Sequence, residues 1–573
     1  MFNRISNRYT SLRSALYATV VGVGSLLFPV TGQTGTWTPD PSLGDPAQHL
    51  RIYNIGRRYG DEHFDESVSL IQRNTGRRGG HILRESAYYA FGLLLTGDPE
   101  DKKRAEKIIP MVLSKQDLNQ DRPTYGNFPF TLEDQLETMV DPDLNNTQFT
   151  GVALGQIIDL DRKQQHVLPE ALRKQLEESF RLAVEATIRR DVDPGYTNIA
   201  FFSAAIGALG EKLLGYPGAG DFAMSKLSWF LTRAQPGVSV REYLAPTYYG
   251  ADLEAVYTVK AFASNPALAD AAERTINALW RDIAPSYHAP TLQLAGPHSR
   301  AYGENMLEYA AALKYFLYLA LDGKYPLPDF ETKHNWDTGG LTMVADLPVT
   351  VRREFREAPE PWREVSVAGG SGKAFRQYRE GDFILGSINM QSLWQQQRSV
   401  VAYWPITTPY WNVGFCEDMS AETLGNGYAH FCSVQSKGAV LAAVTGKLPV
   451  PEKGGLLFGF NAGAQAQELA GGPAGSCIVH NGDVTTYIYP VSQQAGARMT
   501  FASDVEKDRV YVERSWASSD PVGKFNVLAY LVVFQLPGEP VPVVKGLSIK
   551  GVEENTIATA EVNGTPLSLK VRE

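Results

Sequence analysis

The hydrophobic pattern of this chain changes its period once, and that change limits the folds it can adopt. From Ile82 to about Leu321, apolar residues recur every three or four positions, as in amphipathic helices. After Leu327 and Pro328, short β-branched and aromatic runs follow, bounded by Gly, Pro, Asp or Asn. A chain of 573 residues also exceeds one hydrophobic core, since single cores stop growing near ~250–300 residues. The sequence therefore predicts a helical domain followed by a β-rich domain.

About nine helices are predicted in the first half, joined by loops that contain Gly and Pro. They cover residues 84–95, 100–115, 146–158, 168–190, 197–214, 221–232, 251–263, 266–283 and 302–321. Consecutive helices on short connections usually pack as antiparallel neighbours. An α/α toroid, an α-solenoid or a bundle would all fit, although the lack of a fixed repeat period counts against a regular solenoid. Residues from about 33 to 80, rich in Pro, Gly, Asp and Arg, are interpreted as a segment wrapping this domain.

The second half reads as a series of short strands. The predicted β-rich part opens at residues 339–344, and further strand-like runs cover residues 399–404, 439–444, 485–489 and 509–512. Residues 526–534 form a continuous apolar run, which suits a strand buried on both faces. Many short strands without helices between them predict antiparallel sheets, most simply a β-sandwich. We place the domain boundary near residue 330, which gives domains 33–330 and 331–573.

The first 32 residues are predicted to be a secretory signal peptide. Arg4, Arg8 and Arg13 precede a mostly apolar stretch at residues 15–28, and small residues follow at 30–32. The apolar stretch is too short for a spanning helix, and the alternative is an uncleaved membrane anchor. The mature protein is therefore expected to be extracellular or periplasmic, without stable membrane insertion.

Charge and cysteine content restrict the partners further. A net charge of −9 and a pI of about 5.6 argue against nucleic-acid binding. A net acidic protein can still bind an anionic substrate, but only through a locally basic surface. Cys416, Cys432 and Cys477 allow at most one internal disulfide, and the sequence does not choose the pair. No Cys/His spacing resembles a zinc site. We predict that catalysis needs no cofactor, and nothing in the sequence indicates a structural divalent metal.

Three short polar-aromatic segments interrupt the helical half: residues 195–198, 245–250 and 296–303. Four of their side chains carry an amide, a phenol, an imidazole and a guanidinium: Asn198, Tyr248, His298 and Arg300. Elimination from a uronic acid needs groups of this kind. Its carboxylate must be neutralised, for which an amide or a guanidinium is suited. A base, His or Tyr, must remove the C5 proton, and an acid, Tyr, must protonate the departing O4.

Each of these residues also has a structural interpretation. Asn198 follows Pro194 and Gly195 at a helix start, where Asn often serves as an N-cap. A Tyr pair in a loop is often half-buried packing with a satisfied hydroxyl, and Arg300 could be a surface charge. His298 is flanked by polar residues and proline, which makes a core histidine less favoured.

The order of these segments resembles that of the functional segments in toroid-plus-sandwich polysaccharide lyases, the heparinase II/III-like and alginate-lyase-like group. The segments are Tyr196-Thr197-Asn198, Glu242-Tyr243-Leu244-Ala245-Pro246-Thr247-Tyr248-Tyr249-Gly250 and Pro297-His298-Ser299-Arg300. The resemblance implies an incomplete α/α toroid followed by an antiparallel β-sandwich. It also implies an exported lyase that cleaves a uronic-acid-containing, acidic polysaccharide by β-elimination.

Residue roles follow from the same resemblance. Asn198 would neutralise the carboxylate, and Tyr248 would donate the proton and could also serve as the base. His298 would be the partner base or a second neutraliser, with Arg300 assisting. Four further side chains are expected to bind substrate: His81, Arg84, Tyr249 and Tyr302. The chain departs from the family where Leu244 and Ala245 replace residues that are often polar. It departs again in that His334, His430 and His480 match no catalytic or metal-binding histidine of the β domain.

Two other classes of function remain open from the sequence. A glycoside hydrolase on an α/α scaffold needs two carboxylates across a cleft, and the chain offers Glu85, Asp141, Asp252, Glu254 and Glu304. A secreted carbohydrate-binding protein without catalysis would use aromatic side chains for stacking on sugars, such as those at residues 403–404 and 410–412.

Overall fold

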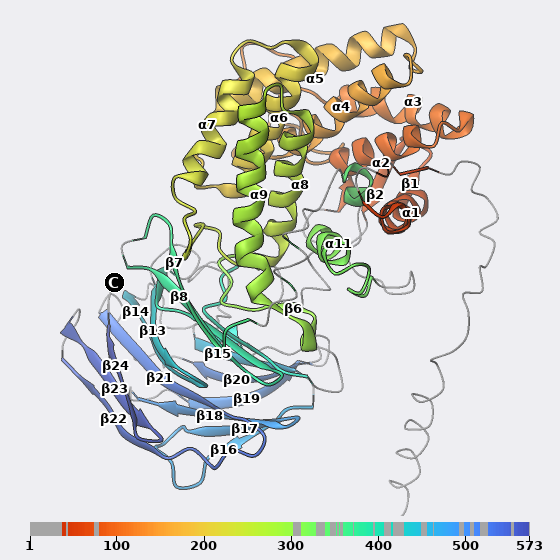
Figure 1. The fold of residues 1–573 in the computed structure, drawn as a ribbon. Helices are drawn as coiled ribbons and strands as arrows, with labels where there is room; N and C mark the ends of the chain where they lie inside the picture. Colours follow the sequence, from red (N-terminus) through yellow and green to blue (C-terminus); the bar gives the residue numbers. More distant parts are fainter. Residues whose placement is uncertain are drawn as a thin grey trace, which may run out of the picture. The chain divides into compact units, whose positions relative to one another are not determined.

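A computed structural model of the chain describes most residues from 37 onward. The described residues are 37–39, 41, 44–73, 79–301, 311–327, 338–343, 351, 355, 359–370, 372–392, 396–405, 414–415, 429–447, 455–461, 463–491, 498–504, 509–515, 525–551 and 555–571. Helices fill the N-terminal part of this range and strands fill the C-terminal part (Figure 1). The predicted signal peptide and the predicted boundary near residue 330 lie outside the described residues.

The predicted helices are found at nearly the predicted places. They are α2 (Leu83–Leu95), α3 (Pro99–Leu113), α4 (Asn146–Lys163), α5 (Glu170–Arg190), α6 (Thr197–Leu214), α7 (Ala219–Leu231), α8 (Pro246–Phe262), α9 (Pro266–Ser286) and α11 (Ala311–Ala320). The start of the helix predicted over residues 302–321 lies outside the described residues. Helix α8 begins five residues before its predicted start, because Pro246 is suited to the first turn of a helix.

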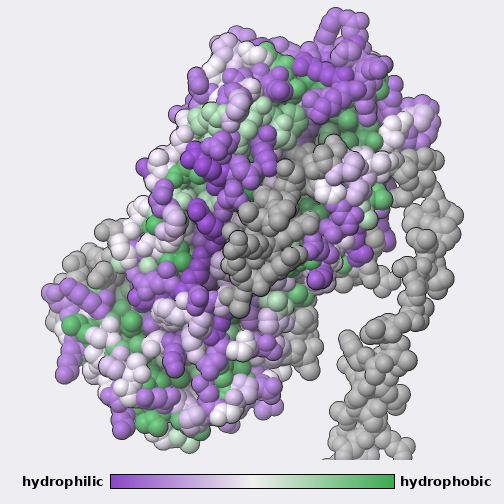
Figure 2. Space-filling model, in the orientation of Figure 1, coloured by the Kyte–Doolittle hydropathy of each residue, from purple (hydrophilic) through white to green (hydrophobic). Residues whose placement is uncertain are grey.

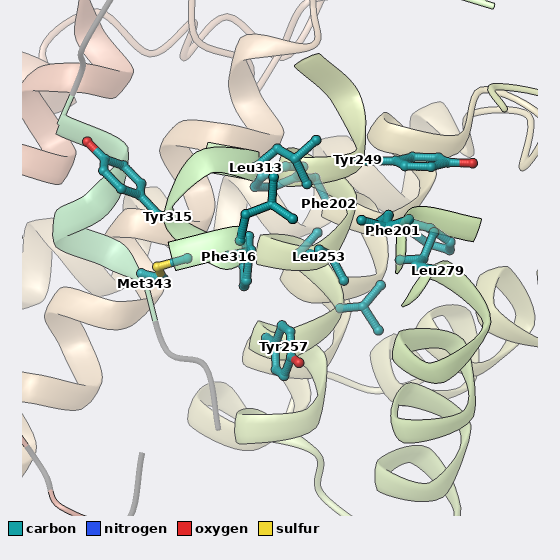
Figure 3. Close-up of a cluster of buried hydrophobic side chains, with 14 of the residues drawn as sticks. Phe201, Phe202, Tyr249, Leu253, Tyr257, Leu279, Leu313, Tyr315, Phe316 and Met343 are labelled. Atoms are coloured by element: carbon teal, nitrogen blue, oxygen red, sulfur yellow. The ribbon is translucent and has the colours of Figure 1, made fainter. Parts of the chain in front are cut away.

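The helices form two layers, and within each layer a helix packs against the second one after it in the chain. Helices α2, α4, α6 and α8 form such a series, and α11 follows on α8. Helices α3, α5, α7 and α9 pack on these as a second layer. Figure 3 shows the apolar core between α6, α8, α9 and α11, in which the Tyr257 and Phe316 rings stack at 5.5 Å. Burial of this core is the main stabilising contribution in the helical part.

One further helix, α1 (Pro46–His63), lies within residues 33–80, for which composition predicted only a wrapping segment. The Asp45 side chain caps it by accepting a hydrogen bond from the Ala47 N–H at 2.9 Å. Ile52 and Ile55 are buried on its inner face. The many polar residues between these apolar ones explain why the helix was missed.

The prediction that the β-rich part opens at residues 339–344 was wrong. Residues Thr338–Thr342 form a 3₁₀ helix, η3, which packs on α1 and α2. Leu341 inserts between these helices at two glycines: a Cβ on Gly56 would lie 3.0 Å from it, and one on Gly92 2.7 Å. The apolar run therefore belongs to the helical core, and the first strand described after it begins at Trp362.

The strands of the C-terminal part form antiparallel sheets. The largest has the order β10 (Met390–Ser392), β13 (Ala429–Ser436), β14 (Ala439–Lys447), β21 (Phe525–Gln535), β18 (Val484–Pro490), β17 (Cys477–Asn481) and β16 (Gln465–Glu468). A second has the order β12 (Gly414–Phe415), β15 (Gly455–Asn461), β20 (Arg509–Ser515) and β19 (Arg498–Asp504). A third consists of β22 (Val544–Lys550), β23 (Ile557–Val562) and β24 (Thr565–Lys570).

The continuous apolar run at residues 526–534 is β21, and the prediction that it is buried on both faces is confirmed. Tyr530 and Val532 join one hydrophobic core, whereas Leu531 and Val533 join a second core shared with β23 and β24. Successive side chains of a strand point to opposite faces, so a strand between two cores needs apolar residues throughout. Cys432 and Cys477 are buried in the same sheet, Cys477 as a reduced thiol, and Cys416 lies outside the described residues.

One sheet includes strands from both halves of the chain. Its order is β11 (Val400–Tyr403), β9 (Phe383–Ile388), β8 (Ala374–Glu380), β7 (Trp362–Val367) and β4 (Val238–Ser239). Strand β4 comes from the loop between α7 and α8 and pairs with β7 in parallel. Its sequence neighbours at residues 240–250 are thereby fixed next to the β-rich part.

The helical part also has two small sheets of its own. They are β1 (Phe64–Asp65), β2 (Leu70–Arg73) and β3 (Gly80–His81), and β5 (Tyr287–His288) with β6 (Gln293–Leu294). Hydrophilic side chains cover most of the face shown in Figure 2. Among the described helices, none combines the length and apolar character needed to span a bilayer.

Candidate active site

The three polar-aromatic segments meet in space, with Arg300 at the centre. Its Nη2 donates to the Tyr248 hydroxyl oxygen at 2.7 Å and its Nη1 donates to Glu242 Oε1 at 2.7 Å. Its Nε donates to Gln396 Oε1 at 3.0 Å, which adds a residue from the β-rich part. The guanidinium carbon also lies 3.9 Å from the centre of the Tyr248 ring, within range of a cation–π contact.

Asn198 joins this cluster through Glu242. It is the second residue of α6, and both its backbone N–H and its Nδ2 donate to Glu242 Oε2, at 3.2 and 3.1 Å. Asn198 is 1% exposed, so its amide is occupied by a protein carboxylate and is shielded from solvent. The structure thus places Asn198 in the site, but its contact is with Glu242.

The loop before α6 is held in place by a buried lysine. The Lys226 ammonium of α7 donates to Asp191 Oδ1 and to the Val192 carbonyl, both at 2.6 Å. Asp191 has a positive φ of 41°, a backbone conformation that ends α5. The loop then presents Tyr196, whose hydroxyl accepts a hydrogen bond from Asn145 Nδ2 at 3.1 Å and whose ring centre lies 5.7 Å from the Arg300 guanidinium.

Tyr248, Tyr196 and Arg300 are partly exposed and can reach a bound molecule. Tyr248 stands in the first turn of α8, where Pro246 starts the helix. Because a guanidinium only donates hydrogen bonds, the Tyr248 oxygen must accept from Arg300, and its own hydrogen points elsewhere. Burial alone would lower the pKa of Arg300, but Tyr248 and Glu242 raise it, so the guanidinium is charged at every relevant pH.

His298 lies behind this surface and is fully buried. Its Nδ1 donates to the Leu244 carbonyl at 2.6 Å, which fixes the tautomer because a carbonyl only accepts. Its Nε2 lies 3.3 Å from the Tyr403 hydroxyl. Both ring nitrogens of His298, the predicted proton-transfer residue, therefore contact the protein.

His298 and Tyr249 both hydrogen-bond to the backbone of Leu244. Its φ of 45° lies in the left-handed region, which costs roughly 1–3 kcal/mol for a residue other than glycine. The Leu244 N–H donates to the Tyr249 hydroxyl at 3.0 Å, while its carbonyl accepts from His298. Both polar groups of this strained residue are thus held, and the turn that it makes separates Glu242 from Tyr248.

The structure does not place Tyr249 on the surface where substrate binding was predicted. Its side chain is fully buried, and Figure 3 shows its ring among the apolar side chains of the helical core. Its hydroxyl donates to Asp282 Oδ2 at 3.2 Å, and Asp282 also pairs with Arg363 at 3.1 Å. Tyr249 therefore supports the site from within.

The other predicted substrate-binding residues lie in different surroundings. His81, in β3, bonds with Glu133 and Asp65; burial lowers its pKa, but these two carboxylates raise it above the ordinary value. The Arg84 guanidinium lies over the Phe130 and Phe149 rings, at 5.2 and 4.9 Å. Neither has a described contact with the Tyr248 cluster. Tyr302 lies outside the described residues.

Glu242 is the site residue that sequence reasoning missed as a functional group. It was part of the quoted segment, but nothing in the local sequence distinguishes it from a solvated acid. Its partners lie 44 and 58 residues away in the chain. A second carboxyl group, Asp252 of α8, is fully buried, and neither of its oxygens has a hydrogen-bond partner. Burial raises the pKa of Asp252 well above its ordinary value, Glu242 raises it further and Arg300 lowers it.

Two arginines besides Arg300 lie near Tyr196, namely Arg190 and Arg241. Arg241 lies against Gly195, where its Nη1 would be 3.4 Å from an added Cβ, and the backbone of Arg398 pairs with that of His298. Arg190 donates to Asn145 Oδ1 at 2.7 Å. Arg190, Arg241 and Arg300 thus supply positive charge near Tyr196, next to the carboxylates of Asp193 and Glu242.

The described residues around Arg300 include no group suited to hold a metal ion. Within the described part of the chain, no group of three or more His, Cys, Asp or Glu side chains is arranged to hold a metal ion. A cavity of about 520 Å³ lies on α5 and the turn after α6, and its lining includes Glu178, Arg181 and Tyr216. Its lining shares no residue with the cluster around Arg300.

The chain belongs to the family whose model matches residues 52–346, described as a domain of unknown function (DUF8769). Among curated proteins, no significant match in sequence is found.

Three solved structures are similar to this chain over nearly its whole length. A crystal structure of heparinase III has a TM-score of 0.49 at 11% identity, with 94% of each chain covered. Heparan sulfate lyase HepC from Pedobacter heparinus has a TM-score of 0.39 at 12% identity, covering 93% of this chain and 92% of that one. Chondroitin AC lyase from Streptomyces coelicolor A3, in complex with chondroitin sulphate, has a TM-score of 0.45 at 10% identity, covering 97% and 88%.

Solved structures similar to this chain thus include polysaccharide lyases, as the sequence motifs predicted. At identities of 10–12% and TM-scores below 0.5, the activity has to be argued from the residues of the chain itself.

Proposed function

We propose that this protein is an exported polysaccharide lyase that cleaves a uronic-acid-containing polysaccharide by β-elimination. The observation that carries the proposal is the contact between Arg300 and Tyr248: a partly exposed phenol whose oxygen accepts a hydrogen bond from a guanidinium at 2.7 Å. The predicted toroid-plus-sandwich architecture is supported by the alternation of packed helices and by the antiparallel sheets.

Tyr248 is the proposed proton carrier. A guanidinium that donates to the phenol oxygen stabilises the negative charge on that oxygen, because hydrogen bonds to an ionised acceptor are the strong ones. Tyr248 can therefore take the C5 proton of the uronate and then return a proton to O4 of the leaving sugar. The Arg300 contact remains in place through both steps.

Arg300 is also proposed to face the uronate carboxylate. Removal of the C5 proton places charge on the carboxylate, and a fixed cation beside it lowers the barrier. Asn198 and Glu242 then act as positioning residues, since Glu242 accepts from both Asn198 and Arg300. This differs from the sequence-based hypothesis, in which the Asn198 amide contacts the substrate directly.

The buried position of His298 has a stereochemical consequence. If Tyr248 alone both removes the C5 proton and protonates O4, the two must lie on the same face of the sugar ring. D-glucuronate and D-mannuronate have this arrangement, whereas their C5 epimers do not. We therefore expect cleavage at D-glucuronate or D-mannuronate units, with little at L-iduronate or L-guluronate units.

The glycoside hydrolase alternative has weaker support. Asp252 has the raised pKa of a general acid, but its side chain is fully buried and cannot reach a bound sugar in this structure. Glu254 bonds with Thr342, and Glu85 pairs with Arg73. Asp141 is exposed, and Glu304 lies outside the described residues.

The carbohydrate-binding alternative depends on exposed aromatic rings. Tyr403 and Trp404 do not provide them, because both are buried and Trp404 Nε1 donates to the Asn481 carbonyl at 3.0 Å. Residues 410–412 lie outside the described residues.

The products of the reaction test the proposal. The chain from about residue 33 would be incubated with polysaccharides of known uronate, namely alginate, glucuronan, heparan sulfate, chondroitin, hyaluronan and ulvan. The masses of the fragments would then be measured. Elimination leaves an unsaturated uronate end that is lighter by one water than the product of hydrolysis. Fragments with the mass of hydrolysis products would reject the lyase in favour of a hydrolase.

A further inference from the structure

The hairpin between β7 and β8 carries a lysine to the edge of the site. The parallel pairing of β4 with β7 is extended by two backbone hydrogen bonds: Ser366 N donates to the Gly237 carbonyl at 3.0 Å, and Ala368 N donates to the Ser239 carbonyl at 2.9 Å. These bonds fix the start of the hairpin loop against the segment that continues to Glu242. Lys373, at the end of the loop, is positioned by the same contacts, since Val367 N donates to its carbonyl at 2.8 Å.

The Lys373 ammonium rests on an aromatic platform. It lies 5.2 Å from the centre of the Tyr243 ring, a distance at which a cation is attracted to the ring face. Tyr243 is fully buried, stacks on Phe375 at 5.6 Å and donates to Gln391 Oε1 at 2.6 Å. The platform is therefore rigid, and the lysine side chain is half-buried on it.

A second cation, Arg241, lies near Lys373. It is exposed, and its side chain lies against Gly195, with Cδ 3.7 Å from the position of an added Cβ. Burial, followed by the charge of Arg241, lowers the pKa of Lys373 to about 8. Across the described residues, neither Lys373 nor Arg241 forms an ion pair or a side-chain hydrogen bond. The Asp193 carboxylate also lies beside Gly195, with Oδ1 2.8 Å from the same added Cβ, but no ion pair joins it to Arg241 among the described residues. The two neighbouring cations repel each other, and a bound anion would relieve this repulsion.

We propose that Arg241 and Lys373 form an anion-binding subsite for a carboxylate or sulfate group on a sugar unit next to the one at Tyr248. This proposal rests on the assignment of Tyr248 as the reaction centre. Two residues of the subsite are chain neighbours of residues that contact Arg300. Arg241 precedes Glu242, the partner of Arg300, and Gly195 precedes Tyr196, whose ring faces Arg300. The substrate would then be an anionic polysaccharide recognised at two successive units.

Selective protection of Lys373 from acylation tests the subsite without any need for turnover. The chain would be treated at pH 8 with an amine-specific N-hydroxysuccinimide ester, and modification would be measured peptide by peptide by mass spectrometry. Lys570, exposed on β24, is the internal control. We expect an anionic polysaccharide to protect Lys373 but not Lys570, and neutral dextran to protect neither. In Arg241→Gln, about tenfold more polysaccharide should be needed for the same protection.

The choice of polysaccharide distinguishes the two sources of the anion. Protection by heparan sulfate, and by its unsulfated backbone heparosan or by alginate, assigns the subsite to a carboxylate. Protection by heparan sulfate alone assigns it to a sulfate. The subsite is overturned if none of the three protects Lys373, or if Lys570 is protected equally.

A second measurement separates this proposal from the lyase assignment. The same labelling would be repeated with Tyr248→Phe, which should still be protected although it yields no unsaturated product. Protection without any elimination by the unmodified chain would support the subsite and reject the lyase. With an active enzyme, KM should rise as the pH passes about 8, where Lys373 loses its charge. Lys373→Arg should remove that rise because arginine stays charged, and a rise that persists in this variant would contradict the subsite.

Discussion

Arg300 and Tyr248 are joined in two ways: the guanidinium donates to the phenol oxygen at 2.7 Å, and it also lies 3.9 Å from the ring centre. The two residues are 52 positions apart in the chain: Tyr248 stands in the first turn of α8, and Arg300 lies in the loop after β6. A phenol held in this manner by a charged partner can exchange protons with a bound molecule, because Tyr248 is partly exposed. Proton transfer by Tyr248 therefore requires that Arg300 stays in position.

Glu242 is expected to keep Arg300 there. Replacing Glu242 by Gln removes the charge that pairs with the guanidinium at 2.7 Å, while the size of the side chain is retained. We expect kcat to fall roughly 10–100-fold with a smaller change in KM, and the free energy of unfolding to fall by about 1–3 kcal/mol. Gln396→Ala, which removes a neutral partner of the same guanidinium, should cost less in both measurements. Equal effects of the two variants would show that the Glu242 charge is unimportant.

His298 is expected to position the Leu244 turn rather than to move protons. An asparagine at this position can place its amide nitrogen near the site of Nδ1 and donate to the Leu244 carbonyl, but it has no counterpart of Nε2. His298→Asn should therefore keep turnover within about tenfold, whereas His298→Ala should lose about 1–3 kcal/mol of stability and more activity. A well-folded His298→Asn protein with turnover as low as that of the alanine variant would identify His298 as the base.

Asp252 is expected to make stability depend on pH. Burial raises the pKa of Asp252 in the folded state well above its ordinary value of 3.8, so the folded protein keeps a proton that the unfolded chain releases. The contribution of this group is fully present below about pH 4 and is lost as the pH rises toward the folded-state pKa. Asp252→Asn should remove this loss, so that the variant gains stability over the wild type between pH 4 and 8.

Denaturant unfolding at several pH values measures this difference. Asp121→Asn, a substitution at an exposed carboxylate, should keep the wild-type pH dependence. If Asp252→Asn and the wild type show parallel stability curves across this range, Asp252 ionises normally in the folded protein.

Much of the helical part could be predicted from the sequence because each helix repeats its apolar residues with one period. Helix α6 has the predicted bounds, Thr197–Leu214, and its start carries Asn198 as expected. Helix α1 was missed because its apolar positions are sparse. Residues 339–344 were assigned to the β-rich part because a short apolar run does not reveal whether it packs as a strand or as a 3₁₀ turn against glycines.

The candidate site could be predicted only as a set of residue types. The meeting of Asn198, Tyr248 and Arg300 follows from the packing of α6 and α8 and from the pairing of β4 with β7, neither of which is encoded locally. Two adjacent tyrosines of α8 differ in burial, which the sequence does not reveal. Tyr248 is partly exposed, whereas Tyr249 is fully buried in the core. Glu242 has no local signal at all, because its functional contacts are made across 44 and 58 residues.

The central claim is that the Tyr248 hydroxyl carries the protons of a β-elimination. The most direct test compares the wild type with Tyr248→Phe on the same uronate polysaccharide, by the ultraviolet absorbance of the unsaturated product and by binding of the polysaccharide. We expect absorbance to rise with the wild type and the rate to fall roughly 10²–10⁴-fold in Tyr248→Phe, with binding largely retained. Tyr216→Phe, at a tyrosine on the turn after α6, should behave as the wild type. Near-normal elimination by Tyr248→Phe would contradict the claim.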